Sequence, residues 1–170
     1  NLQVASWGGG NDSKKQMSKT GDKNNQKMSS SIKTIFSSAL FLNLHPRSQI
    51  DLNLVVLGDA GGRLAACCNA ATLAFIDAGL PMRDFVVGCE GGYLNGGTVV
   101  DLSSEEKAHY AGVGGSVVMP VVVMPQRNRV LLCQCESRVG AEVFEEVLDA
   151  GWEGCILIFK RMRDAVRAQA

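Results

Sequence analysis

The strongest constraint on the fold of this chain is a strand, a glycine-rich turn and a small-residue helix that follow one another without a gap. In Ser48–Leu57, apolar residues alternate with polar ones, which predicts a strand with one buried and one solvated face. Gly58–Gly62 predicts a turn, and the alanines and cysteines of Arg63–Ala78 predict a helix that can lie close to a sheet. Gly79 fits the left-handed position that ends a helix, and Pro81 follows it.

Before this unit, the chain changes from polar to periodic. Leu2–Trp7 predicts a short strand, and Gly8–Gln26 predicts a flexible basic loop because it is polar and lacks periodicity. Apolar residues three and four apart predict a helix over Ser29–Asn43, with Ser29–Ser31 supplying N-cap oxygens. Pro46 prevents this helix from continuing, since proline lacks an amide hydrogen.

After the unit, short apolar runs alternate with turn signals until one long amphipathic segment closes the chain. The order predicts an α/β (α+β) sandwich in which helices cover a mixed sheet, formed as a single domain over residues 1–170. The remaining predicted elements are strands over Phe85–Cys89 and Thr98–Leu102, turns over Glu90–Gly92 and Asn95–Gly97, a polar connection over Ser103–Gly115, a hairpin of Val117–Met124 with Val130–Cys135, and a helix over Gly140–Gln169.

Charge is balanced overall but divided unevenly along the chain. The 170 residues hold 17 basic and 17 acidic side chains, which excludes a global charge typical of nucleic-acid binding. Residues 1–47 carry seven basic and two acidic residues, a net charge of +5, and residues 48–170 carry a net charge of −5. The basic segment is either a solvated lysine-rich loop or a loop that contacts a polyanion.

The six cysteines argue for a packing role. No C-x-x-C pair is present and only two histidines occur, which argues against a zinc site. Their apolar surroundings predict small buried side chains in a reducing compartment. No apolar stretch approaches the roughly 18 residues that a membrane helix needs, and we expect no membrane partner. The chain starts at Asn1 without a secretory signal, and we expect its true start to lie upstream.

Two segments could carry chemistry. Amides of the Gly58–Arg63 turn could bind an anion at a helix start, with Arg63 adding a bidentate grip, although a plain tight turn explains the same glycines. Asp101, Glu105 and Glu106 could offer oxygen ligands to Mg²⁺, although a solvated acidic turn explains them better. Residues 107–135 contain no Asp or Glu, so that connection and the strand after it supply no further carboxylate.

Three stretches together resemble the RNase PH family. They are His45–Asp51, Cys67–Ala74 and Asp77–Asp84, and the similarity extends over nearly the whole chain. It is strongest to RNase PH-like ring subunits of the RNA exosome, of the kind that is catalytic in archaea. The resemblance implies the ribosomal-protein-S5 domain-2-like sandwich, with the first strands of the domain expected before Asn1.

The resemblance also implies an ancestral reaction. Active members remove nucleotides from RNA 3′ ends with inorganic phosphate, using an arginine for the phosphate and two aspartates near a metal ion. Gly61 and Gly62 match the family's turn, but the arginine falls on Leu64. The aspartates fall on Lys107 and on Val113 or Val118. We therefore expect no catalytic residue, metal or cofactor in this chain.

The expected function is a non-catalytic, structural subunit of the exosome core ring that frames the RNA channel and supports 3′-to-5′ RNA processing and degradation. Expected partners are other RNase PH-like ring subunits, cap proteins, RNA and an associated hydrolytic nuclease. The resemblance implies location in the nucleus, nucleolus and cytoplasm. Exposed strand edges and the apolar stripe of the last helix would be partly interfacial. Expected RNA or phosphate contacts are Lys14, Lys15, Lys19, Lys23, Gly61, Gly62 and Arg63.

Two alternatives remain open. The chain could be a working phosphate-dependent 3′-to-5′ exoribonuclease, with Arg63 holding phosphate and Asp101, Glu105 or Glu106 holding the metal. It could instead occupy another RNase PH-like position of the same ring.

Overall fold

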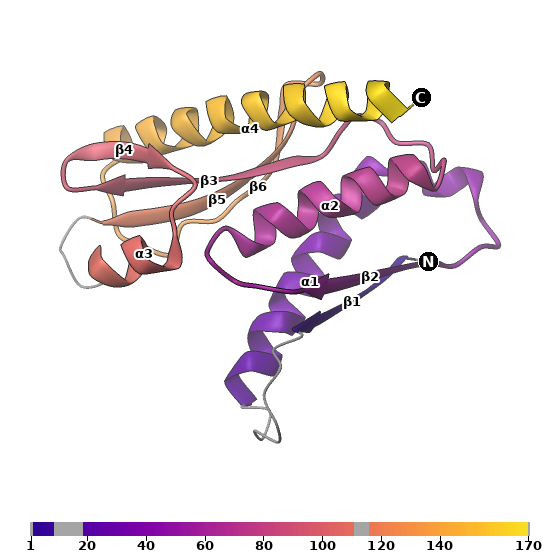
Figure 1. Ribbon diagram of the computed structural model, residues 1–170, viewed down its shortest axis with the longest axis horizontal. Coiled ribbons are helices and arrows are strands. Elements are labelled where there is room, and N and C mark those ends of the chain that lie inside the picture. Colours follow the sequence, from indigo (N-terminus) through magenta and orange to yellow (C-terminus); the bar gives the residue numbers. More distant parts are fainter. Residues whose placement is uncertain (1, 9–18, 111–115, 170) are drawn as a thin grey trace.

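The computed structural model describes residues 2–8, 19–110 and 116–169 and arranges them in layers (Figure 1). A long helix covers one face of an antiparallel sheet, two helices pack beneath the opposite face, and a parallel strand pair lies below them. The elements are β1 (Leu2–Gly8), α1 (Lys19–Ala39), the 3₁₀ turn η1 (Leu42–Leu44), β2 (Ile50–Val56), α2 (Arg63–Asp77), β3 (Val87–Leu94), β4 (Gly97–Val100), α3 (Ser104–Tyr110), β5 (Val117–Met124), β6 (Arg129–Cys133) and α4 (Ala141–Gln169).

The described strands form two sheets. β1 and β2 pair in parallel, with Leu2 opposite Ile50 and Gly8 opposite Val56. The other four strands are antiparallel in the order β4-β3-β5-β6. The predicted sandwich of helices and sheet is therefore confirmed, although among the described residues the parallel and antiparallel pairings belong to separate sheets rather than one mixed sheet.

β5 is the wall between two hydrophobic cores. Met119 and Val121 are fully buried in the core beneath α4. Val122 and Met124 are buried in the core that α1 and α2 share with β2. This division follows from the period of two along a strand, because successive side chains point to opposite faces. A strand that is apolar on both faces has a continuous run of hydrophobic residues in its sequence, as β5 does.

Small side chains let α2 lie against β3, as the sequence predicts. A Cβ at Gly88 would lie 2.8 Å from the Cα of Ala65, so the two backbones nearly touch. The Asn69 side chain accepts a hydrogen bond from the Gly88 amide and donates one to its carbonyl, at 2.8 and 2.9 Å. The Thr72 hydroxyl donates to the Val86 carbonyl at 2.6 Å. These bonds satisfy polar groups that burial would otherwise leave unpaired.

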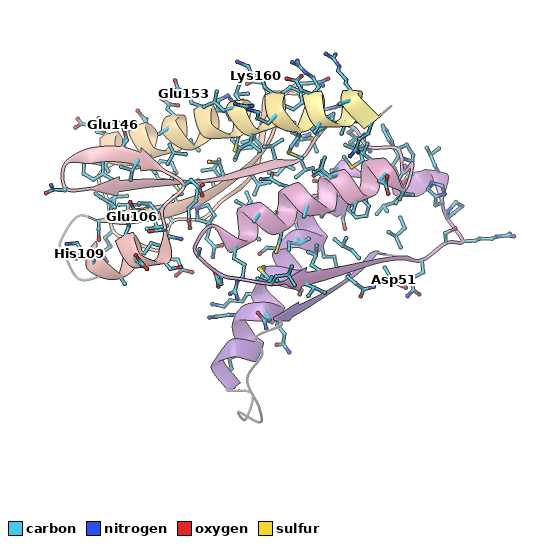
Figure 2. The ribbon with its side chains drawn as sticks, in the orientation of Figure 1. Asp51, Glu106, His109, Glu146, Glu153 and Lys160 are labelled. Carbon is cyan, nitrogen blue, oxygen red and sulfur yellow. The ribbon has the colours of Figure 1, made fainter. Side chains whose placement is uncertain are left out.

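The last helix covers the opposite face of the sheet. Its own side chains Val147 and Cys155 are fully buried against the sheet, and a Cβ at Gly91 would lie 2.7 Å from the Val147 carbonyl oxygen. Glu146 and Glu153 point away from the sheet into solvent (Figure 2). Of the apolar stripe of this helix, Val147, Cys155 and Met162 are buried, whereas Val143, Ile158 and Val166 are half-buried. A partly interfacial role for the stripe stays a prediction.

The start of α1 corrects a prediction. The helix begins at Lys19, so the part of the predicted loop over residues 19–26 is helical, and Ser29–Ser31 lie in the helix interior rather than at its N-cap. Its first buried side chain with a described environment is Met28. Residues 23–27 are exposed or half-buried and carry no apolar repeat, which is why a periodicity argument starts the helix too late.

Two further predictions fail between residues 85 and 115. Glu90–Gly92 lies inside β3 rather than in a turn, because the glycines there allow close packing against α4 and Leu102. The polar connection contains the short helix α3. Four cysteines are buried as predicted, and Cys133 and Cys135 are half-buried. Among the described helices, none has a stretch long and apolar enough to cross a bilayer.

Candidate functional site

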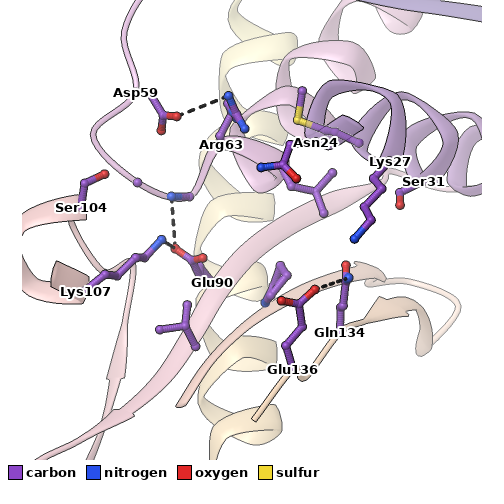
Figure 3. A pocket seen from close by; sticks show the side chains of 16 residues that line it. Asn24, Lys27, Ser31, Asp59, Arg63, Glu90, Ser104, Lys107, Gln134 and Glu136 are labelled. Atoms are coloured by element: carbon purple, nitrogen blue, oxygen red, sulfur yellow. Dashed lines mark hydrogen bonds and ion pairs between the residues drawn. The ribbon is translucent and has the colours of Figure 1, made fainter. Parts of the chain in front are cut away.

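A cavity of about 660 Å³ opens where the glycine-rich turn meets α1, α3 and the segment after β6 (Figure 3). Its walls combine residues from six separate parts of the chain, namely α1, the turn with the start of α2, β3, α3, β5 and the segment after β6, so only the folded domain assembles it. The lining residues are Asn24, Lys27, Met28, Ser31, Asp59, Gly61, Gly62, Arg63, Leu64, Glu90, Ser104, Lys107, Val118, Pro120, Gln134 and Glu136.

The turn is held rigidly against the start of α3. Gly61 and Gly62 have positive φ angles of 123° and 59°, a backbone geometry that favours glycine. A Cβ at Gly61 would lie 2.3 Å from the Leu102 carbonyl oxygen, so no larger residue fits. The Ser104 amide donates to the Ala60 carbonyl at 2.6 Å. These contacts tie the turn to the start of α3.

A buried carboxylate occupies the start of α2. Glu90 is only 8% exposed, and its Oε2 accepts a hydrogen bond from the Gly62 amide at 3.1 Å. The same oxygen pairs with Lys107 Nζ at 2.5 Å. Both partners are needed, because an unpaired charge in the protein interior is strongly unfavourable. Three elements, namely α2, β3 and α3, therefore meet at one oxygen atom.

Lys107 is aimed by the cap of its own helix. The Glu106 amide donates to Ser103 Oγ at 3.2 Å, and the Ser103 amide donates to Glu106 Oε2 at 2.8 Å, which is a reciprocal capping box. The bond from the Ser103 amide holds the pKa of the Glu106 carboxyl below its ordinary value. Glu106 thus stabilises the start of α3, and Lys107 extends from that fixed turn toward Glu90.

The acidic residues singled out in the sequence do not form a metal centre. Glu105 is exposed, Glu106 is used in the cap, and Asp101 sits at a positive φ of 60° with its amide bonded to the Glu90 carbonyl. Within the described ranges, no three His, Cys, Asp or Glu side chains come together in a way that could hold a metal ion.

The other charges of the cavity come from the turn and from α1. Arg63 Nη1 lies 3.5 Å from Asp59 Oδ2, and both side chains are more than one-third exposed, so this pair contributes little stability. Lys27 is exposed at the cavity wall and forms no ion pair with a described residue. The wall therefore holds three cations, Lys27, Arg63 and Lys107, of which two are paired.

The predicted site residues are only partly brought together. Gly61, Gly62 and Arg63 line the cavity, as do Leu64, Lys107 and Val118, on which the family's functional residues fall. Lys23 is exposed on α1 but does not line the cavity, and Lys19 is the first residue of that helix. Lys14, Lys15 and Val113 lie outside the described residues.

Glu90 and Lys27 are among the cavity residues that the sequence did not single out. Glu90 was assigned to a turn, although a charged residue beside the apolar run at 85–89 is itself a signal of a buried partner. Lys27 falls between the predicted loop Gly8–Gln26 and the predicted helix Ser29–Asn43, although it lies on the same face of α1 as Ser31, one turn before it. Neither position could be joined to the Gly58–Arg63 turn without knowing the tertiary structure.

Comparison with known proteins identifies the domain. Residues 3–81 match the model of the 3′ exoribonuclease family, domain 1, known as RNase PH. The chain contains an RNase PH family domain. It is also homologous to exosome complex component RRP41: it is 40% identical to the mouse protein over 130 residues, which is 76% of this chain and 51% of that protein. Identity to the Pyrococcus horikoshii protein is 35% over 147 residues, which is 86% of this chain and 57% of that protein.

Solved structures confirm the RNase PH-type fold. Rice Rrp46 superimposes with a TM-score of 0.79 and 19% identity, covering 98% of this chain and 73% of that one. A chain of an archaeal exosome core superimposes with a TM-score of 0.68 and 17% identity, covering 95% of this chain and 68% of that one. This chain spans about half the length of the mouse protein that it matches.

Proposed function

We propose that this RNase PH domain is a non-catalytic, structural part of a subunit of an exosome core ring. Its homology to RRP41 and its structural similarity to Rrp46 and to an archaeal exosome core support a place in such a ring. There it packs beside other RNase PH-like subunits, frames the RNA channel and supports 3′-to-5′ RNA processing and degradation by an associated hydrolytic nuclease.

The observation that carries the proposal is Lys107 in the cavity. Phosphorolysis in this family depends on a phosphate-binding arginine and two metal-binding aspartates, as the resemblance implies. Leu64, Lys107 and Val118 line the cavity at the corresponding positions, and Lys107 brings a positive charge paired to Glu90. Removing one preorganised electrostatic group typically costs about 10²–10³ in rate, so losing three leaves no effective catalysis.

RNA contact belongs to the basic face near the cavity. Lys23 and Lys27 are exposed and lie one turn apart on α1, and Lys14, Lys15 and Lys19 precede them in the chain. Phosphodiester backbones bind such lysines through charge alone, with an affinity that falls steeply as salt rises. Cap proteins and a location in nucleus, nucleolus and cytoplasm complete the proposal.

Two measurements on tagged complexes from the native source test it. The first is native mass with subunit identification, for which we expect a hetero-oligomer containing distinct RNase PH-like partners. The second is incubation of that complex with labelled RNA, Mg²⁺ and inorganic phosphate, for which we expect no nucleoside diphosphate. Phosphate-dependent release of nucleoside diphosphates that Arg63→Ala abolishes would overturn the proposal in favour of an active exoribonuclease.

A further inference from the structure

The first turn of α2 has the features of an anion cradle. Gly62 is its N-cap residue, with a φ of 59° and no side-chain cap, so the backbone amides there depend on an outside acceptor. Amides at a helix start favour negative charge, and the helix dipole adds to that preference. Arg63 and Lys107 line the same wall, so two cations stand beside these amides.

The acceptor at this cradle is the protein's own carboxylate. Glu90 Oε2 receives both the Gly62 amide, at 3.1 Å, and Lys107 Nζ. These are the two donor types that a bound oxyanion would use, namely a backbone amide and an ammonium group. Glu90 reaches the cradle from the middle of β3, a strand whose residues are buried on both faces.

Hydrogen bonds fix both the backbone of Glu90 and the helix that carries its partner Lys107. The backbone carbonyl of Glu90 accepts a hydrogen bond from the Asp101 amide at 2.7 Å. Three residues after Asp101, the Ser104 amide donates to the Ala60 carbonyl, and this bond ties the glycine-rich turn to α3. Lys107 is held by the capped start of its helix. The carboxylate is therefore preorganised at the cradle, and it balances the Lys107 charge as Asp59 balances Arg63.

We propose that the Glu90 carboxylate excludes small tetrahedral oxyanions from this cavity, because it already occupies the donors that they would use. Neutralising Glu90 then creates an inorganic phosphate site formed by the Gly62 amide, Lys107 and Arg63. The inference rests on the proposed non-catalytic function, because it names the group that keeps the ancestral cavity from taking up phosphate. Asp59 competes for Arg63, so the Gly62 amide and Lys107 carry most of the new site.

The experiment is a calorimetric titration of inorganic phosphate into the full chain. Four proteins are compared: wild type, Glu90→Gln, Glu90→Gln with Lys107→Met, and Glu146→Gln, which removes one negative charge from the exposed face of α4. We expect Glu90→Gln to bind phosphate at least about tenfold more tightly than wild type, with competition by sulfate but not by chloride. The double variant and Glu146→Gln should match wild type.

Equal phosphate affinity in wild type and a folded Glu90→Gln would overturn the inference, and so would a gain that survives Lys107→Met. Circular dichroism checks folding, and Glu90→Ser replaces Glu90→Gln if the amide is not tolerated. These outcomes are separable from those of the proposed function. Nucleoside diphosphate release by the wild-type complex would end the non-catalytic reading, whereas the titration alone decides whether Glu90 excludes phosphate.

Discussion

The two faces of β3 are stabilised by different physical forces. On one face, Cys89 and Gly91 pack under α4, where a Cβ at Gly154 would lie 2.6 Å from Cys89 Sγ. On the other face, Glu90 meets Lys107 and the Gly62 amide. The α4 face depends on close apolar packing alone, whereas the opposite face combines close packing of α2 at Gly88 with a buried charge at Glu90 that has matched partners.

This difference separates what the fold requires from what the cavity requires. Packing beneath α4 needs only the right shape and volume, so it is indifferent to what the cavity binds. The cavity face needs a balanced set of charges, and balance can be reached with a resident carboxylate and a lysine as well as with a ligand. Three substitutions separate the two kinds of stabilisation.

Lys107→Met should have the largest effect. It leaves the Glu90 carboxylate buried with the Gly62 amide but without its cation, and we expect the free energy of unfolding at neutral pH to fall by about 3 kcal/mol. Urea denaturation measures the change. Lys107→Arg, which keeps the charge, is the matched control, and Glu90→Gln added to Lys107→Met should recover part of the loss. An undisturbed midpoint for Lys107→Met would show that the pair contributes nothing.

Gly91→Ala should have a smaller effect, and one independent of charge. The added Cβ would lie 2.7 Å from the Val147 carbonyl oxygen, so α4 must shift away from the sheet. Overpacking of this kind costs about 2 kcal/mol. Gly140→Ala is the control, because a Cβ there meets nothing within 4 Å. If the two alanine variants unfold at the same urea concentration, the close approach of α4 is not a constraint.

Cys155→Ala should show the smallest charge-dependent effect, a change in the slope of stability against pH that appears only at high pH. Burial raises the pKa of the Cys155 thiol from its ordinary value of 9.0 to about 12. The thiol stays protonated in the folded state while it ionises in the unfolded chain, so its contribution is complete below pH 9 and is lost as pH rises toward 12. Wild type should therefore lose up to about 1 kcal/mol per pH unit more than the variant over this range.

Urea titrations at several pH values between 8 and 11 measure that difference. Cys135→Ala is the control, because Cys135 is only half-buried. Parallel stability curves for wild type and Cys155→Ala would contradict the assignment of Cys155 to a desolvated position in the core.

Periodicity predicted the elements whose burial is one-sided or complete. The alternation in Ser48–Leu57, the apolar hairpin at 117–133 and the amphipathic helix at 141–169 all appear close to their predicted bounds. Burial follows the pattern too, since Leu52 and Leu54 are buried and their neighbours are not. In these elements, the side chains that the hydrophobic pattern predicts to be buried are the ones that make tertiary contacts.

The rest depended on contacts between distant segments. Glu90-Gly91-Gly92 has the composition of a turn, but it is a strand because α4 and Leu102 come within reach of its glycines. The pairing of Glu90 with Lys107 joins residues 17 positions apart through the loop and helix that follow β4. The sequence singled out the turn and Arg63, which line the cavity, but it could not show that the Glu90 carboxylate lies at the start of α2.

The position of β5 has a consequence for how the domain unfolds. Its alternate residues belong to both cores, so neither core can be completed while this strand is unpaired. Loss of β5 would expose both layers together, and the layers cannot melt one after the other. We expect a single cooperative transition, in which probes placed on α2 and on α4 report the same midpoint.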